Sequence, residues 1–213
     1  MHFISEELEN YIEKHSAAEP ELLQQLNKET YQKILQPRML SGHFQGRVLS
    51  MLSKIINPKH ILELGTYTGY ATLCLAEGLK SDGTIDTIDI NEELEDIQQK
   101  YFNTSAFKDH IIQHVGNALD IVPTLNKKFD LVFIDADKEN YINYWNLIVP
   151  MMNKGGIILS DNVLWSGKVL EDVQKNDKST PILLKYNKIV NEDPRVETVL
   201  LPLRDGLTVS RIL

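Results

Sequence analysis

The stretch 129–165 reads FDLVFIDADKENYINYWNLIVPMMNKGGIILSDNVLW, and it decides the fold. It holds two apolar runs, each followed by polar residues, and between them an amphipathic segment that is typical of a helix. If the two runs are neighbouring parallel strands joined by a helix, their carboxyl ends lie at the same edge of a sheet. We therefore expect Asp135, Asp161 and Asn162, which follow these runs, to converge there.

The same alternation of strand and helix extends on both sides of this stretch. Apolar runs predict strands at 60–64, 84–90, 111–115, 129–134 and 156–160. Helical spacing fills the gaps at about 69–80, 92–102, 118–125, 139–151 and 181–192. Strands that alternate with helices are typical of right-handed βαβ units, so we expect a doubly wound α/β fold with helices on both faces of the sheet.

The C-terminal tail has a different pattern. Two β-rich runs, 196–202 and 207–213, are separated by a segment that contains Asp205-Gly206, which is a hairpin signal. They bring the predicted sheet to seven strands, mostly parallel, with an antiparallel hairpin strand at the C-terminal end. Before the last helix, the polar segment 166–180 is too long for an ordinary connection. It is either a lid over the site or an insertion without a role.

The N-terminal region has helical spacing as well. Apolar residues three and four positions apart predict helices over residues 5 to about 35, and Pro37 ends that run. A further helix follows it. We expect residues 1–56 to form a helical cap on an α/β core of residues 57–213, within a single domain.

Charge and composition exclude several classes of partner. The 213 residues include 22 lysines and arginines and 30 aspartates and glutamates, a net charge of −8, with no basic block that would attract nucleic acid. No apolar run approaches the ~18 residues of a membrane span, and the N-terminus lacks the pattern of a signal peptide. We therefore expect a cytoplasmic protein that binds a small molecule. Cys74, the only cysteine, lies in an apolar helical pattern and is expected to be buried and inert.

A strand, a glycine turn and a helix start occupy residues 61–70. Gly65 would allow a sharp turn after the strand, and Gly69 would let the helix N-terminus approach a ligand. Tyr67 stands where dinucleotide-binding turns have their middle glycine, so a pyrophosphate would find little room against the backbone. The turn therefore favours a ligand without a pyrophosphate. Glu63, beside the turn, could instead bond the N–H groups of the loop.

Two further groups follow the next two strands. Asp89 can accept hydrogen bonds from both hydroxyls of an adenosine ribose, or it can cap the following helix. Together with the glycine turn, it favours the ribose interpretation. Asp86 has a different register in the strand and is expected in solvent. The small residues at 115–118 would let an adenine ring lie against the backbone.

The acidic group after the two apolar runs predicts a metal site. Asp135 and Asp161 offer carboxylates and Asn162 offers an amide oxygen, a set that matches the octahedral oxygen coordination of Mg²⁺. Each residue alone is better explained as a helix cap or a loop acid, but three of them at adjacent strand ends are not. Lys138 lies three residues beyond Asp135, close enough to face the same ligand.

With these groups, the chain resembles the cation-dependent O-methyltransferases that use S-adenosylmethionine, the family of catechol O-methyltransferase and the plant caffeoyl-CoA enzymes. The resemblance is carried, in chain order, by MLSGHFQGR (39–47), ELGTYTGY (63–70), TIDTIDIN (84–91), FIDADKENY (133–141), LSDNVLWSG (159–167) and DGLTVSRI (205–212). The chain departs from the family at Ala71, where relatives commonly carry serine. It also lacks the tryptophan that precedes Met39 in the mammalian catechol enzyme.

The resemblance implies a role for each group. S-adenosylmethionine would be lined by Met39, Ser41, Glu63, Gly65, Tyr67, Gly69, Asp89, Ala118 and Asp135. A divalent cation, Mg²⁺ with Mn²⁺ or Ca²⁺ as alternatives, would be held by Asp135, Asp161 and Asn162, and Lys138 would be the catalytic base. The acceptor, an aromatic compound with two adjacent hydroxyls, would lie near Arg38, Lys138 and Trp165, and the protein would be a homodimer. The alternatives are a non-catalytic S-adenosylmethionine-binding module and an NAD-dependent dehydrogenase.

Overall fold

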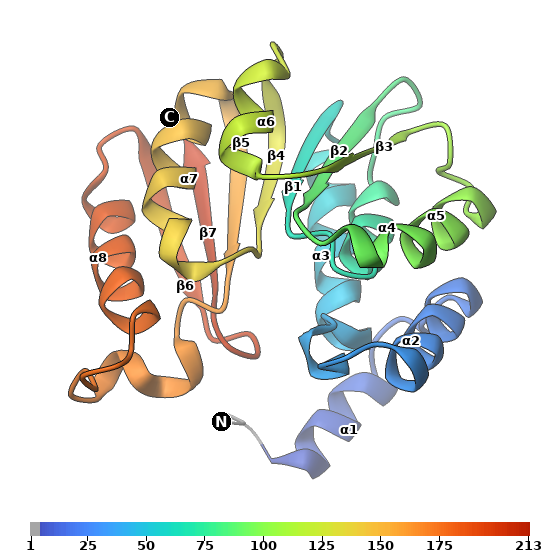
Figure 1. The fold of residues 1–213 in the computed structure, drawn as a ribbon, viewed down its shortest axis with the longest axis horizontal. Coiled ribbons are helices and arrows are strands. Elements are labelled where there is room, and N and C mark those ends of the chain that lie inside the picture. The colour runs from blue at the N-terminus through green and yellow to red at the C-terminus, as the bar shows by residue number, and fades with distance from the viewer. Residues whose placement is uncertain (1–4) are drawn as a thin grey trace.

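A seven-stranded sheet runs through the molecule between two layers of helices (Figure 1). The structure is a computed structural model, and it describes residues 5–213. The strand order is β3-β2-β1-β4-β5-β7-β6. The strands are β1 (His60–Leu64), β2 (Thr84–Asp89), β3 (Ile111–Val115), β4 (Phe129–Ile134), β5 (Met152–Asp161), β6 (Val196–Leu201) and β7 (Leu207–Ile212). β1 to β5 pair in parallel, whereas β7 is antiparallel to both β5 and β6, which confirms the predicted fold class.

One strand is longer than predicted. The sequence placed it at 156–160, but β5 begins at Met152, which pairs with Phe129 of β4. The register then shifts before the next pair, and Gly155 adopts a φ of +78°. Gly155 is therefore part of an irregularity inside the strand, where glycine tolerates a conformation that other residues rarely adopt.

Four helices pack on one face of the sheet and three on the other. The first group is α2 (Glu21–Lys33), α3 (Gly42–Ile56), α4 (Tyr70–Ala76) and α5 (Glu95–Thr104), and the second is α6 (Ala118–Ile121), α7 (Tyr141–Ile148) and α8 (Ser179–Glu192). α1 (Glu6–Lys14) has no buried residue. Short 3₁₀ turns are η1 (Pro37–Met39), η2 (Glu92–Leu94), η3 (Val122–Thr124), η4 (Lys138–Asn140), η5 (Val149–Met151) and η6 (Trp165–Leu170).

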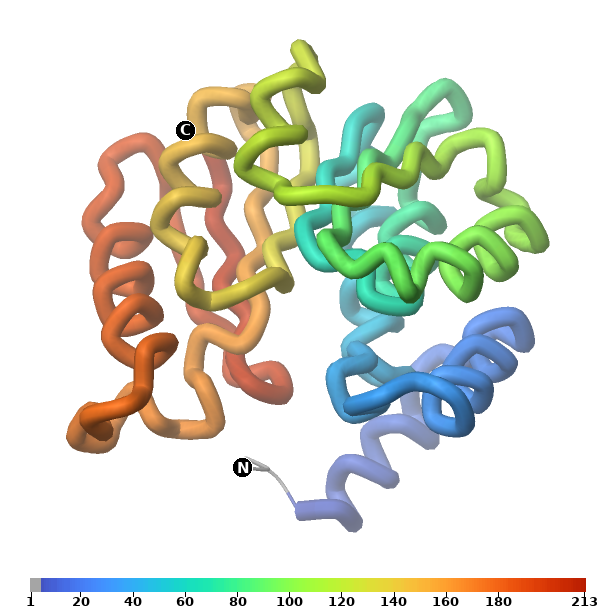
Figure 2. The backbone as a smooth tube through the Cα atoms, viewed as in Figure 1, coloured from blue at the N-terminus to red at the C-terminus, as the bar shows by residue number. Residues whose placement is uncertain are grey.

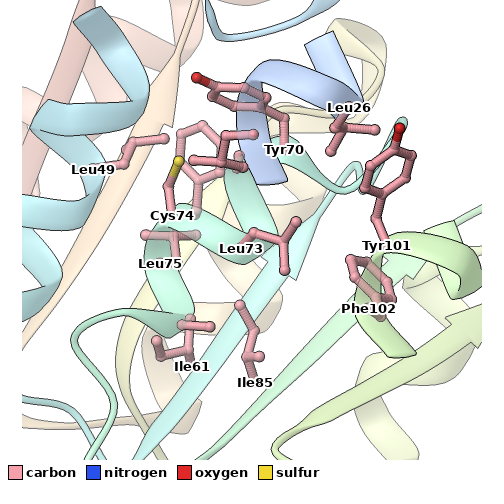
Figure 3. Close-up of a cluster of buried hydrophobic side chains, with 14 of the residues drawn as sticks. Leu26, Leu49, Ile61, Tyr70, Leu73, Cys74, Leu75, Ile85, Tyr101 and Phe102 are labelled. Atoms are coloured by element: carbon pink, nitrogen blue, oxygen red, sulfur yellow. The ribbon is translucent and has the colours of Figure 1, made fainter. Parts of the chain in front are cut away.

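Alternate residues of the central strands supply the two cores. In β4, Leu131 and Phe133 pack with the first helix group, whereas Val132 and Ile134 pack with the second. This is the two-residue period of a strand that is buried on both faces. Figure 3 shows part of the first core, where Cys74 lies among leucines and aromatic rings. Cys74 is buried, which confirms the prediction. Burial raises the pKa of its thiol to about 12, so the thiol stays protonated.

The predicted helix bounds fail where local packing interrupts a helical pattern. The N-terminal run of 5 to about 35 forms helices as predicted, α1 and α2, and Pro20 precedes the second. The helix predicted at 69–80 ends at Ala76, and a Cβ at Gly78 would overlap the backbone of α3. Among residues 5–213, no helix is long and apolar enough to span a membrane.

Candidate functional site

A cavity of about 1380 Å³ lies at the carboxyl ends of the parallel strands. Its volume exceeds the roughly 300–1,000 Å³ typical of a single ligand, so it has room for two molecules side by side. Twelve of the fourteen residues predicted for the site line it. They are Arg38, Met39, Ser41, Gly65, Tyr67, Asp89, Ala118, Asp135, Lys138, Asp161, Asn162 and Trp165.

One end of the cavity is built around Asp89, at the end of β2. Its Oδ2 accepts a hydrogen bond from the Tyr67 backbone N–H at 2.7 Å, and its Oδ1 accepts one from the Asn91 N–H at 2.9 Å. An ionised carboxylate can accept about four hydrogen bonds, so each oxygen keeps capacity for a further donor. The two backbone bonds orient Asp89 and leave it able to accept from two adjacent hydroxyls. The helix-cap role belongs to Asn91, whose side chain accepts from the Glu93 N–H.

The glycine turn beside Asp89 is held in place by the neighbouring strand. Gly65 has a φ of +96°, as the predicted sharp turn requires, and a Cβ there would overlap the backbone oxygen of Asp135. Its N–H donates to the Ile88 carbonyl at 2.9 Å, and the Asp135 N–H donates to the Leu64 carbonyl at 2.8 Å. The glycine therefore lets two strand ends approach closely, which joins the Asp89 end of the cavity to the Asp135 end.

Glu63 and Gly69 do not line the cavity, and their predicted contacts with a ligand stay predictions. Glu63 is fully buried under the turn, where its Oε2 accepts hydrogen bonds from the Thr72 and Thr87 hydroxyls. Burial raises the pKa of Glu63 to about 8, with a smaller contribution from Asp135 and Asp89. A Cβ at Gly69 would overlap the Phe102 ring, so this glycine makes room for α5.

The opposite end of the cavity holds Asp135, Asp161 and Asn162, as predicted. Asp161 is 2% exposed, and its Oδ1 accepts a hydrogen bond from the Asn162 N–H at 2.8 Å. Burial raises the pKa of Asp161 above its usual range, and the charge of Asp135 adds to that rise. Asn162 has a φ of +57°, in the left-handed region that asparagine adopts more readily than other residues with a Cβ. Two acids that repel each other in a buried site form a place where a bound cation would be stabilised.

Among residues 5–213, Lys138 is the one cation that the structure places against this pair. Its Nζ lies 3.0 Å from Asp135 Oδ1 and donates to the Tyr141 hydroxyl at 2.7 Å. Tyr141 in turn donates to the Asp161 carbonyl at 2.8 Å, and burial raises the pKa of its hydroxyl, which therefore stays protonated. The sequence reasoning missed Tyr141, although a tyrosine three residues after Lys138 on a short helical turn was the available signal.

The donor chemistry of this end fits a hard divalent ion. Asp135, Asp161 and Asn162 present oxygen atoms only, the type that Mg²⁺ prefers. Within residues 5–213 there is no group of three or more His, Cys, Asp and Glu side chains that could hold a metal. The set here has two carboxylates and one amide, and it would leave coordination positions for substrate or water.

Asp86 was expected in solvent, and that expectation is wrong. Asp86 is 1% exposed, lies 2.9 Å from His114 Nε2 and forms an ion pair with Lys127 at 2.6 Å. A buried carboxylate is tolerated when it is paired in this way. Asp86 stabilises the contact between β2, β3 and the chain before β4, and it takes no part in the cavity.

The rest of the cavity lining includes Trp165, Arg38 and Ser179, which come from segments far apart in the chain. Trp165 and Ser166 both have positive φ angles, 47° and 55°, at the start of η6. Residues 171–178 then lead to α8, and this connection lines a smaller cavity next to Trp165. The segment predicted as a lid therefore lies beside the main cavity, and its closure stays a prediction.

Comparison with known proteins agrees with this geometry. The family model described as O-methyltransferase matches residues 13–213. Caffeoyl-CoA O-methyltransferase 5 of Nicotiana tabacum is 35% identical over 97% of this chain and 91% of its own length. The O-methyltransferase of Bacillus cereus, solved with SAH, superimposes with a TM-score of 0.90 at 26% identity, covering 97% of each chain. The O-methyltransferase TomG of Streptomyces achromogenes, solved with SAM, has a TM-score of 0.88 at 25% identity, covering 97% and 96%.

Proposed function

The chain belongs to the O-methyltransferase family and is an S-adenosylmethionine-dependent enzyme, and from this premise we propose that it methylates one hydroxyl of an aromatic compound with two adjacent hydroxyls, with the help of a divalent cation. The observation that carries the proposal is the cavity itself. Asp89 lies at one end, and Asp135, Asp161 and Lys138 lie at the other, so a methyl donor and an acceptor can be bound next to each other.

The Asp89 end is assigned to the donor. The free capacity of both Asp89 oxygens suits the two hydroxyls of a ribose, and the absence of the middle glycine at Tyr67 disfavours a pyrophosphate. Met39, Ser41, Gly65, Ala118 and Asp135 complete the walls around it. The solved relatives from Bacillus cereus and Streptomyces achromogenes hold SAH and SAM respectively, which supports the same cofactor here.

The Asp135 end is assigned to the cation and the acceptor. Asp135, Asp161 and Asn162 would hold the ion, with Mg²⁺ as the first choice and Mn²⁺ or Ca²⁺ as alternatives. A bound divalent cation lowers the pKa of a hydroxyl next to it, and a drop of ~3 units corresponds to about 4 kcal/mol in favour of the nucleophilic form. Arg38 and Trp165 line the cavity on the acceptor side and would contact the ring or its substituent.

Lys138 is assigned as the base that takes the proton of the reacting hydroxyl. Asp135 and Tyr141 fix its Nζ at the acceptor end, and the side chain is only 8% exposed. Neutral Lys138 has a lone pair that can accept this proton, whereas the ammonium form has none. The oxygen then attacks the methyl carbon of the sulfonium, and the thioether leaves with the electron pair of the broken bond.

The caffeoyl-CoA O-methyltransferases among the relatives support a phenolic acceptor. Family membership leaves the NAD-dependent dehydrogenase without support. A non-catalytic S-adenosylmethionine-binding module would bind the cofactor and transfer nothing. A homodimer and a cytoplasmic location, both expected from the sequence, stay predictions.

The test is transfer of a labelled methyl group to matched pairs of acceptors. Each pair consists of an aromatic compound with adjacent hydroxyls and the same compound with one of them removed. We expect label in the diol of a pair and little in its partner, because one oxygen alone cannot occupy two positions at the acceptor end. Equal labelling of both would exclude the diol requirement. Binding of S-adenosylmethionine without transfer to any acceptor would favour the binding module.

A further inference from the structure

A chain of polar contacts connects the C-terminal hairpin to the acidic end of the cavity through Gln45 on α3. The amide Nε2 of Gln45 donates to Asp161 Oδ2 at 2.5 Å, and its Oε1 accepts from Arg204 at 2.8 Å. Gln45 is 1% exposed, so no solvent competes for either bond. The contact joins residues that are 116 positions apart in the chain.

The chemistry of Arg204 fixes which way the Gln45 amide faces. A guanidinium has only N–H donors, so the group that faces it must be the amide oxygen. The amide nitrogen is then directed at Asp161, whose carboxylate can only accept when ionised. A flipped amide would place two acceptors together at Asp161 and two donors together at Arg204, and a buried mismatch of this kind is destabilising.

Arg204 is itself held at the tip of the turn between β6 and β7. Arg204 has a φ of +47°. Its guanidinium also donates to the carbonyls of Leu40 and Ser41, in the loop that lines the Asp89 end of the cavity. In Figure 2 this turn points toward the chain that follows α2. One guanidinium therefore contacts both the loop that lines the cofactor end and the amide that contacts the acidic end.

The same turn also holds the segment after Asp161. The Leu164 N–H donates to the Asp205 carbonyl at 2.9 Å, and the Ser166 N–H donates to the Asp205 carboxylate. A Cβ at Gly206 would overlap Leu164, so the turn packs closely on this segment. The turn thus contacts the chain directly after the predicted ligands Asp161 and Asn162.

We propose that Gln45 and Arg204 are positioning residues for the cation: Gln45 orients the Asp161 carboxylate, and Arg204 orients Gln45. This inference rests on the proposed function, because it assumes that a cation binds at Asp161. Outer hydrogen-bond partners of this kind set the orientation of a ligand and hold it in place. Gln45 donates without a positive charge, so it holds Asp161 and does not compete with the ion for it.

The test is Mn²⁺ affinity, measured from the free-ion paramagnetic resonance signal with neither S-adenosylmethionine nor acceptor present. We expect Gln45→Met, which keeps the side-chain length and removes both polar groups, to weaken Mn²⁺ binding about 10- to 100-fold. Arg204→Met should weaken it less, because the Gln45 donor remains. Arg204→Lys should recover part of the loss, because one donor to Gln45 can be retained.

Gln98→Met is the matched control. Gln98 is also 1% exposed, but its amide donates to the Tyr67 carbonyl at the cofactor end. Gln98→Met should leave Mn²⁺ affinity unchanged, whereas Gln45→Met should leave S-adenosylmethionine affinity unchanged. Thermal unfolding in excess chelator shows that each variant is folded. Mn²⁺ affinity equal to wild type in folded Gln45→Met would overturn the inference alone. A wild-type protein that binds no Mn²⁺ would overturn the cation part of the proposed function and the inference with it.

Discussion

The two ends of the cavity use different means to bind what they hold. At the Asp89 end, a partly exposed carboxylate is oriented by two backbone N–H groups and keeps its accepting capacity for neutral hydroxyls. At the Asp161 end, a carboxylate is buried beside a second acid and is held by the Gln45 amide. The first end therefore presents one oriented carboxylate to uncharged donors, whereas the second brings two carboxylates together and favours a further positive charge. Mutations should separate the two ends.

The largest effect is expected at the acidic end. Asp161→Asn removes one of two carboxylates and should reduce methyl transfer by at least ~10²-fold, because the ion loses a charged ligand. Mn²⁺ affinity, measured as for Gln45→Met, should fall in parallel, and S-adenosylmethionine affinity should not. A variant that transfers methyl groups at the wild-type rate would remove Asp161 from the cation site.

Lys138→Ala should lower kcat by about 10²- to 10⁴-fold, the range of a lost general base. Steady-state kinetics over pH should show that the variant rate rises with pH, because only an acceptor that is already ionised can react. Binding of S-adenosylmethionine serves as the control and should change little. If the turnover and the pH profile of wild type persisted, Lys138 would not be the base.

Asp89→Asn should weaken S-adenosylmethionine binding by about 10- to 100-fold, because hydrogen bonds to a charged acceptor contribute roughly 1.5–3 kcal/mol. Titration calorimetry measures this directly. Mn²⁺ affinity should be equal to that of wild type, the reverse of the Asp161→Asn result. Loss of both affinities together would show that the two ends are one structural unit.

The last effect concerns stability rather than binding. The pKa of Glu63 is raised from 4.5 to about 8 by burial, so the folded state holds its proton over a range where the unfolded state has lost it. The free energy of unfolding should therefore fall as pH rises from about 4.5 to about 8, by up to about 1.4 kcal/mol per pH unit. Below about pH 4.5 both states hold the proton, so Glu63 does not change the free energy of unfolding there.

Glu63→Gln keeps the shape and removes the titration. Urea unfolding at several pH values should show that its stability relative to wild type increases as pH rises through this window. The same relative stability at pH 5 and pH 8 would mean that Glu63 does not titrate as its burial requires. Glu197→Gln, on the exposed side of β6, is the control and should show little change.

The sequence predicted the sheet well because its strands depend on local pattern. The strands at 111–115 and 129–134 have the predicted bounds, and the convergence of Asp135, Asp161 and Asn162 follows from the geometry of parallel strands. Helix ends were predicted less well, because packing partners from elsewhere in the fold, such as α3 against Gly78, decide where a helix stops.

What could not be predicted depends on contacts between distant residues. Asp86 was placed in solvent because its partners His114 and Lys127 lie 28 and 41 positions further along the chain. The contacts of Glu63 could not be predicted, because the strand pattern does not show that two threonines lie beneath the turn. Gln45 stood inside a recognised motif, but only the fold brings it to Asp161.

The central claim is that the acidic end of the cavity acts through a divalent cation. The most direct measurement is the rate of methyl transfer to a vicinal diol after removal of metal with excess chelator, followed by addition of Mg²⁺ above the chelator concentration. The account predicts that transfer stops in chelator and returns with Mg²⁺, while binding of S-adenosylmethionine at the Asp89 end is retained throughout. Full transfer in excess chelator would contradict it.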